Sequence, residues 1–117
     1  MIIILYLCTA KLYNMELEYN DEEIESLVDH KYIGRYKTYK SNAKLIRNLD
    51  KVIRYIRQAA DIKAVAAITS LAYEPLTNSP YSSVRVGYDT KYRLIFEEND
   101  DKITLVLIEL SEHYGDH

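Results

Sequence analysis

The chain has 117 residues, of which 48% are hydrophobic, and a formal net charge of −3. This length supports one compact core, so we predict a single domain over residues 1–117, and the acidic balance argues against general nucleic-acid affinity. The single Cys8 excludes an internal disulfide and favours a cytoplasmic location, and no segment approaches the roughly 18 consecutive apolar residues of a membrane span.

The N-terminal segment leaves two possibilities open. Residues 1–8 are apolar, but they are few and lack the basic start of a secretory signal peptide. Residues 15–19 alternate as a half-buried strand should, and they lead into a helix start at Asn20 or Asp21. Residues 1–14 are therefore either an N-terminal extension of a core at 15–114, or a segment upstream of a true start at Met15.

Two helices are predicted next. Residues 21–30 form a short helix whose apolar side chains Ile24, Leu27 and Val28 face inward, and Gly34 marks the break after it. Residues 43–60 form the clearest helix, with Ser41 or Asn42 as its N-cap. Apolar residues recur there with helical spacing and predict one core-facing stripe, formed by Leu45, Leu49, Val52, Ile53, Ile56 and Ala60.

Charge is divided unevenly along these helices. Residues 16–29 hold seven acids and no Lys or Arg, whereas residues 31–63 hold ten bases against two acids. The outer side of the long helix carries Lys44, Arg47, Lys51, Arg54 and Arg57. This face is either a solvated surface or, together with the tyrosines nearby, a surface for an RNA backbone; the tyrosines are Tyr32, Tyr36, Tyr39 and Tyr55.

The remaining chain is mostly strand. We expect a helical turn or loop over 61–70, a strand over 71–74 stopped by Pro75, a turn over 77–80, a hairpin loop over 98–101 and a buried inner strand over 103–110, covered on both faces. The predicted fold class is α+β, an antiparallel-rich sheet of four to five strands with N-terminal helices packed on one face.

A hairpin over residues 82–97 is the most informative segment. If Tyr88 faces Tyr92, then Val84, Val86, Leu94 and Phe96 share the core face, and Arg85 and Arg93 lie diagonally on the other face. In this register Gly87 is opposite Arg93 and leaves space for an anion. Two arginines in an apolar hairpin therefore predict an anion site.

The last strand ends in an acid, an imidazole and a phenol, Glu112-His113-Tyr114. Alternation would place Glu112 and Tyr114 on the face of Ile108 and Leu110. His113 is the preferred general acid or base, because its reference pKa of roughly 6.5 suits proton transfer in both directions. No metal or cofactor is predicted, since the three histidines are dispersed and there is no glycine-rich loop.

Several stretches together resemble the RelE/ParE superfamily of type II toxins, and most closely its HigB-like branch. These are residues 74–76, 82–86, 91–97 and 109–114, with the Tyr-Arg-Leu-Ile-Phe core of the third as the most specific. The resemblance implies a RelE-like fold and a metal-independent endoribonuclease (an mRNA interferase). Such a toxin cuts messenger RNA on the ribosome, inhibits translation, and is held inactive by a helix-turn-helix antitoxin.

The resemblance also implies roles for individual residues. Arg93 corresponds to the phosphate-binding arginine of the family, and Arg85 stands near its second basic residue. Glu112, His113 and Tyr114 correspond to the catalytic ending, here with imidazole and phenol exchanged in order. Lys91 adds charge near the site, and the helix residues Lys44, Arg47, Lys51 and Arg54 are candidates for RNA binding.

Two other functions remain open at this point. One is a ParE-like toxin that inhibits DNA gyrase without catalysis. The other is a family member that has lost activity and keeps only its antitoxin, which the acidic net charge of −3 favours. Substitution of Arg93 and His113 distinguishes these functions from a nuclease.

Overall fold

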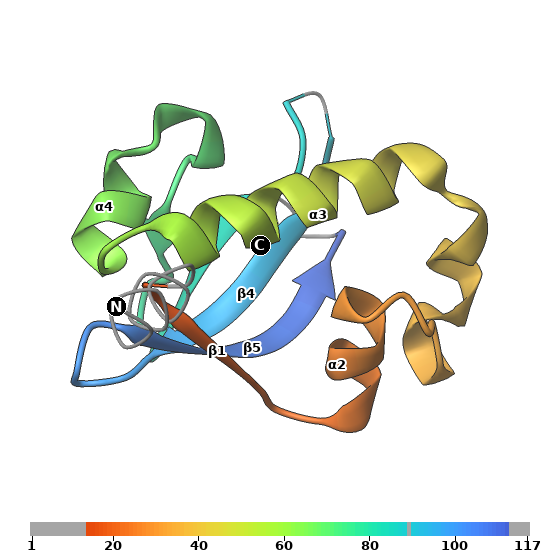
Figure 1. Ribbon diagram of the computed structural model, residues 1–117, viewed down its shortest axis with the longest axis horizontal. Helices are drawn as coiled ribbons and strands as arrows, with labels where there is room; N and C mark the ends of the chain where they lie inside the picture. Colours follow the sequence, from red (N-terminus) through yellow and green to blue (C-terminus); the bar gives the residue numbers. More distant parts are fainter. Residues whose placement is uncertain (1–13, 89, 113–117) are drawn as a thin grey trace, which may run out of the picture.

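The computed structural model describes residues 14–88 and 90–112 (Figure 1). Its elements in chain order are β1 (Glu16–Tyr19), α2 (Glu22–Val28), the 3-10 helix η1 (Gly34–Ser41), α3 (Ala43–Gln58), α4 (Ile62–Ala67), the 3-10 turn η2 (Thr69–Leu71), β2 (Glu74–Pro75), β3 (Tyr81–Arg85), β4 (Arg93–Glu98) and β5 (Thr104–Ser111). No helix within these described ranges has the length and apolar character needed to cross a bilayer.

The strands form one mixed sheet in the order β1-β5-β4-β3-β2. β1 runs parallel to β5, and the other neighbours are antiparallel. In Figure 1, α3 crosses in front of the sheet, with α4 near one end of the helix and α2 near the other. The predicted α+β class, with helices packed against an antiparallel-rich sheet, is therefore confirmed.

The core lies between α3 and the sheet. The apolar stripe predicted on this helix is buried at Leu45, Leu49, Val52, Ile53 and Ile56, although the helix ends at Gln58 and Ala60 is exposed. The core face predicted for the hairpin is also correct, because Val84, Val86, Leu94 and Phe96 are fully buried.

Polar side chains fix where the helices begin. The Asp21 carboxylate accepts from the Ile24 N–H at 2.9 Å, and the Asn42 amide oxygen accepts from the Leu45 N–H at 3.1 Å. Asp61 does the same for the N–H of Ala64 at 3.0 Å. Each such cap contributes about 1 kcal/mol. Of the two N-caps proposed for α3, Asn42 is the one that forms.

The strand predicted over residues 71–74 is wrong in its position. Leu71 closes η2, and Ala72 follows it with a left-handed φ of 45°. The strand is Glu74–Pro75, at the edge of the sheet, where Pro75 pairs with Ser82. Proline is tolerated there because an edge strand needs no ladder hydrogen bond from the nitrogen that faces solvent.

The predicted register of the β3–β4 hairpin is wrong by two residues. Arg85 is the cross-strand partner of Arg93, and Val84 is the partner of Leu94. The Val86 N–H donates to the Tyr92 carbonyl at 3.0 Å, so Val86 and Tyr92 are the last pair of the hairpin and Tyr88 lies in the loop. The loop is therefore longer than predicted. A slip of two residues preserves the faces, which is why the core assignment survived.

β5 is an inner strand, as predicted, but its two faces are not equally covered. Leu105 and Leu107 are fully buried, whereas Val106 and Ile108 are half-buried. A bulge leaves Ile108 unpaired, since Ile95 pairs with Glu109 and Phe96 pairs with Leu107. The bulge puts Leu110 in the core with Leu107, so the predicted shared face of Ile108 and Leu110 does not exist.

Candidate functional site

The two arginines of the hairpin lie side by side at one end of the sheet. Arg85 and Arg93 are direct partners, and Ser111 of β5 is the partner of Arg93 on its other side. Because Val86 and Tyr92 form the neighbouring hydrogen-bonded pair, Arg85 and Arg93 are a non-hydrogen-bonded pair, whose Cα atoms are separated by about 4.5 Å. The two side chains therefore start closer together than the sequence predicted.

The Arg93 side chain is held by its surroundings. It is only 8% exposed, and its Nε donates to the Ser83 hydroxyl at 2.8 Å. Its Nη2 donates to the carbonyl of Ala72, with a longer bond of 3.4 Å to the Ser83 carbonyl. These bonds fix the guanidinium across β3 and connect β4 to the segment that precedes β2.

The Arg85 side chain takes a different direction. Its guanidinium carbon lies 6.0 Å from the ring centroid of Tyr88, whose side chain is 84% exposed. Because the two guanidinium groups have separate partners, no anion is needed between Arg85 and Arg93 to hold them in place. The space predicted opposite Arg93 is also absent, since Gly87 lies beyond the arginine pair.

Gly87 has a different role from the one predicted. Its φ of +91° favours glycine, and a Cβ atom at this position would overlap the side-chain amide of Asn48 and approach Thr90 to 2.9 Å. The Thr90 hydroxyl also bonds the carbonyl of Val86 and lies 3.3 Å from that of Gly87. The glycine therefore lets the hairpin loop fold tightly and approach α3.

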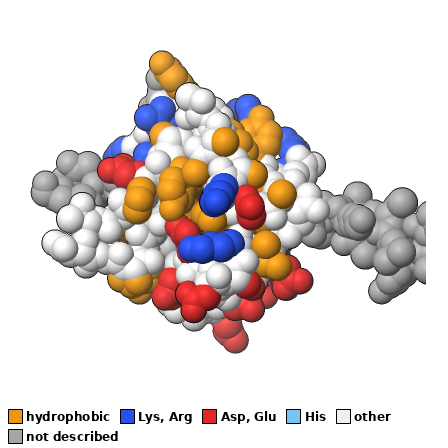
Figure 2. Space-filling view, turned by 90° about the vertical axis from the view of Figure 1, so that its left-hand side faces the viewer, with side chains coloured by type: hydrophobic (Ala, Val, Ile, Leu, Met, Phe, Trp, Pro, Cys, Tyr) orange, Lys and Arg blue, Asp and Glu red, His pale blue; other side chains and the backbone are white. Residues whose placement is uncertain are grey.

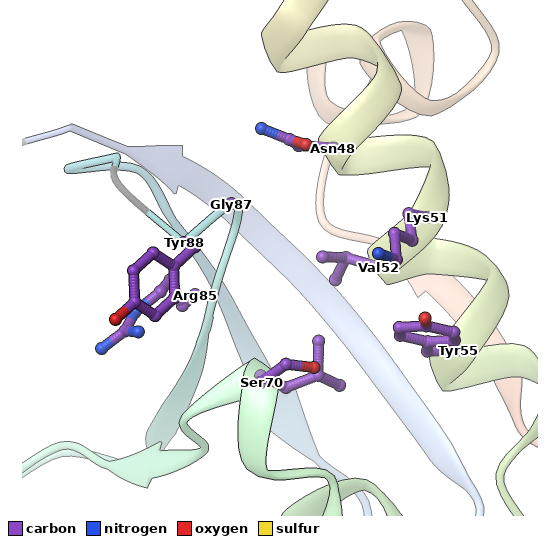
Figure 3. Close-up of a pocket in the computed structure, with 9 residues that line it drawn as sticks. Asn48, Lys51, Val52, Tyr55, Ser70, Arg85, Gly87 and Tyr88 are labelled. Atoms are coloured by element: carbon purple, nitrogen blue, oxygen red, sulfur yellow. The ribbon is translucent and has the colours of Figure 1, made fainter.

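A pocket of ≈ 240 Å³ lies where α3 faces this hairpin (Figure 3). We call it the basic pocket; it is lined by Asn48, Lys51, Val52, Tyr55, Ser70, Leu71, Arg85, Gly87 and Tyr88. In Figure 3, Asn48 extends from α3 toward the hairpin and Lys51 lies close to the helix, whereas the Arg85 and Tyr88 side chains lie together on the side of the hairpin that faces away from α3. The sequence had identified Lys51 and Arg85 separately, and the fold places both on one pocket.

The other predicted RNA-binding residues do not line the basic pocket. Lys44, Arg47 and Arg54 are exposed on α3, and Lys91 is exposed in the hairpin loop. Within residues 14–88 and 90–112, the ion pairs involve other cations, namely His30 with Asp50 and Arg35 with Asp21 and Glu23. Figure 2 faces the end of the molecule on the left of Figure 1 and shows most acidic side chains in the lower part of that surface.

A second pocket of ≈ 360 Å³ lies where β5 ends against η1. We call it the tyrosine pocket; it is lined by Arg35, Tyr36, Tyr39, Glu109, Leu110, Ser111 and Glu112. The Tyr36 hydroxyl accepts from the Leu110 N–H at 3.2 Å, and the Arg35 guanidinium lies 4.7 Å from the Tyr36 ring. This pocket joins η1 to the last strand.

Glu112 belongs to the tyrosine pocket. Burial is the largest cause and the charge of the Glu112 carboxylate, to which Tyr39 is hydrogen-bonded, is the next; together with smaller causes they raise the pKa of Tyr39 to about 12. Tyr39 also meets Tyr92 edge to face, with ring centroids 5.8 Å apart. Glu112 is therefore placed toward η1, while Arg93 pairs with the preceding Ser111. His113 and Tyr114 lie outside the described residues.

No group of three or more His, Cys, Asp or Glu side chains in residues 14–88 and 90–112 is arranged to hold a metal ion. No protein-family model matches the chain, and no curated protein is significantly similar to it.

Proposed function

We propose that this chain is the toxin of a type II toxin–antitoxin system, a cytoplasmic, metal-independent endoribonuclease that cuts messenger RNA on the ribosome. The observation that carries the proposal is the row formed by Arg85, Arg93 and Ser111 on three neighbouring strands. The sequence Glu112-His113-Tyr114 follows Ser111 directly in the chain, so three residue types suited to proton transfer come next in the sequence after the strand that pairs with Arg93.

The chemistry requires few components. Cleavage without a metal needs a base for the 2′-hydroxyl proton, cations for the charge that develops on the phosphate, and an acid for the leaving oxygen. We assign charge stabilisation to Arg93 and Arg85, and proton transfer to His113 with support from Glu112 and Tyr114. The bonds from Arg93 to Ser83 and Ala72 fix the plane of the guanidinium, as expected for a pre-organised electrostatic group.

The basic face of α3 supports the same proposal. Lys44, Arg47, Lys51 and Arg54 are exposed and make no ion pair within the described part of the chain. Such a surface attracts polyanions and speeds their association. It would also attract an acidic segment of a helix-turn-helix antitoxin, which we propose as the partner that blocks RNA access.

The test is to add the purified protein to translating ribosomes and map cuts in the messenger RNA. We expect His113→Ala to slow cleavage by about 10²- to 10⁴-fold, the usual contribution of a general acid or base. Lys63→Ala is the control, because Lys63 is exposed on α4 and lines neither pocket. If Arg93→Ala and His113→Ala both arrest growth as well as the parent does, the nuclease proposal is wrong.

One observation favours a second candidate. The Arg93 guanidinium has partners in Ser83 and Ala72, so its presence is also explained without an RNA phosphate. In that case the chain is a ParE-like inhibitor of DNA gyrase, or an inactive relative that binds only its antitoxin. Blocked supercoiling by gyrase, with no cuts in messenger RNA, would identify the first of these; neither effect, with antitoxin binding retained, would identify the second.

A further inference from the structure

We infer that residues 72–75 form a strap over the guanidinium of Arg93, and that an anion reaches this arginine only when the strap opens. The inference rests on the proposed function only in taking a phosphate as the anion. It adds a means of regulating the same site, because the group that occupies Arg93 comes from the protein itself.

Arg93 is closed to an external anion when the strap is in place. Its side chain is only 8% exposed, with Nε bonded to the Ser83 hydroxyl at 2.8 Å and Nη2 bonded to the Ala72 carbonyl. A phosphate oxygen carries a negative charge that the carbonyl lacks, so it is the stronger acceptor for a guanidinium. A phosphate could therefore replace the Ala72 carbonyl at Nη2, while the bond from Nε to Ser83 keeps the guanidinium plane fixed.

The next residue of the strap, Tyr73, is bound on the other face of the sheet. Its hydroxyl donates to Glu98, which also accepts from the Ser82 hydroxyl at 2.8 Å. Ser82 is the cross-strand partner of the core residue Phe96, so this contact lies on the core face, opposite the contact with Arg93. The strap therefore holds the edge of the sheet from both faces.

The remainder of the strap is weakly attached, and its first residue is strained. Ala72 has a left-handed φ of 45°, which is unfavourable for a residue with a Cβ atom. β2 has only two residues, both exposed, and Pro75 has no N–H to give to a strand ladder. Opening would release the strain at Ala72 at the cost of a few polar contacts. A change in any one of these terms should therefore shift the fraction of open molecules.

The experiment follows Arg93 by NMR while inorganic phosphate is added to the full chain, without ribosomes or RNA. The Nε–Hε signal of Arg93, identified by its loss in Arg93→Met, reports phosphate at this side chain. Tyr73→Phe removes the core-face contact but leaves the bond from Ser82 to Glu98. Phosphate should then bind at Arg93 roughly 3- to 10-fold more tightly, because losing that hydrogen bond raises the open fraction.

Ala72→Gly tests the strap in the opposite direction. Glycine adopts the left-handed conformation without strain, so the closed strap becomes more stable and phosphate should bind roughly 2- to 5-fold more weakly. Tyr81→Phe is the matched control. Tyr81 is on the neighbouring strand β3, and its hydroxyl makes no hydrogen bond to another of the residues that the structure describes. This variant should bind phosphate as the parent does.

The outcomes separate the strap from the proposed nuclease. Opposite shifts in Tyr73→Phe and Ala72→Gly, with no change in Tyr81→Phe, would support the strap even if the protein cuts no messenger RNA. Equal affinities, shifts in the same direction, or an Arg93 signal that never responds to phosphate would overturn the strap. Cleavage on ribosomes would stand in each of those cases, because its assay is independent of this one.

Discussion

The tyrosine pocket and the basic pocket each set an arginine over a tyrosine ring, yet the two pairs have opposite environments. In the tyrosine pocket, Arg35 is bonded to Asp21 and Glu23, and Tyr36 is only 2% exposed. In the basic pocket, Tyr88 is 84% exposed and Arg85 is not ion-paired within the described residues.

The two arginine–tyrosine pairs differ in whether their polar groups bond to other elements of the fold. The Tyr36 hydroxyl accepts the backbone N–H of Leu110, so that pair connects η1 to the end of β5. Among the residues that the structure describes, the Arg85 and Tyr88 pair makes no such connection between elements. Residue types alone therefore do not distinguish a structural contact from a binding surface; the partners of each group do.

The largest expected effect tests this contrast directly. Tyr36→Ala should lower the free energy of unfolding by about 3–5 kcal/mol, as for other large aromatic side chains removed from a core. Tyr88→Ala should change it by no more than about 0.5 kcal/mol, because surface substitutions away from packed groups rarely cost more. Urea unfolding of the two variants provides the comparison. Similar losses would mean that the hairpin tyrosine is also structural.

The same contrast applies to the two neighbouring arginines. Arg93→Met should cost about 2–3 kcal/mol, because it removes a charged donor from the buried Ser83 hydroxyl and from the Ala72 carbonyl. Arg85→Met should cost less than about 0.5 kcal/mol. The measurement is again urea unfolding. An unaffected Arg93→Met variant would show that the bonds to Ser83 and Ala72 contribute no stability and would strengthen a purely functional role for Arg93.

The features that could be predicted from the sequence depend on local periodicity. The buried stripe of α3 follows from helical spacing, and the core face of the hairpin follows from the two-residue period of strands. Neither needs knowledge of the loop. The N-cap of α3 could also be narrowed to two residues from the sequence, because Ser41 and Asn42 are both suitable N-caps and stand directly before Ala43.

The features that could not be predicted depend on contacts distant in sequence. The hairpin register differs from the predicted one because the Thr90 hydroxyl donates to the Val86 carbonyl and Gly87 packs closely against Asn48 of α3. The bulge at Ile108 reversed the faces that alternation had assigned to the end of β5. That Lys51 and Arg85 line the same pocket could not be predicted from nearby sequence, because the two residues are on separate elements.

A smaller effect is expected at the wall of the basic pocket. Gly87→Ala should cost about 1–3 kcal/mol, since alanine is strained at a φ of +91° and its Cβ would overlap the Asn48 amide. Asn48→Ala combined with Gly87→Ala should recover the part of the loss that comes from overlap. Urea unfolding of both single variants and the double variant measures this coupling. Strict additivity would contradict the close approach of hairpin and helix.

The smallest effect lies in the pH dependence of the tyrosine pocket. The pKa of Tyr39 is raised to about 12 from its ordinary value of 10.0, first by burial and then by the charge of Glu112. A raised pKa in the folded state means that the neutral phenol is favoured there. This contribution is therefore complete below about pH 10 and is lost as the pH rises through about 12.

Tyr39→Phe isolates this contribution from other groups that titrate at high pH. The variant should lose stability less steeply than the parent between about pH 10 and 12, when unfolding by urea is compared at each pH. Glu112→Gln should fall between the two, because burial, the larger cause, remains when the charge is removed. Parallel curves for Tyr39→Phe and the parent would mean that the Tyr39 hydroxyl is as well solvated as in the unfolded chain. The tyrosine pocket would then be as open to ligands as the basic pocket.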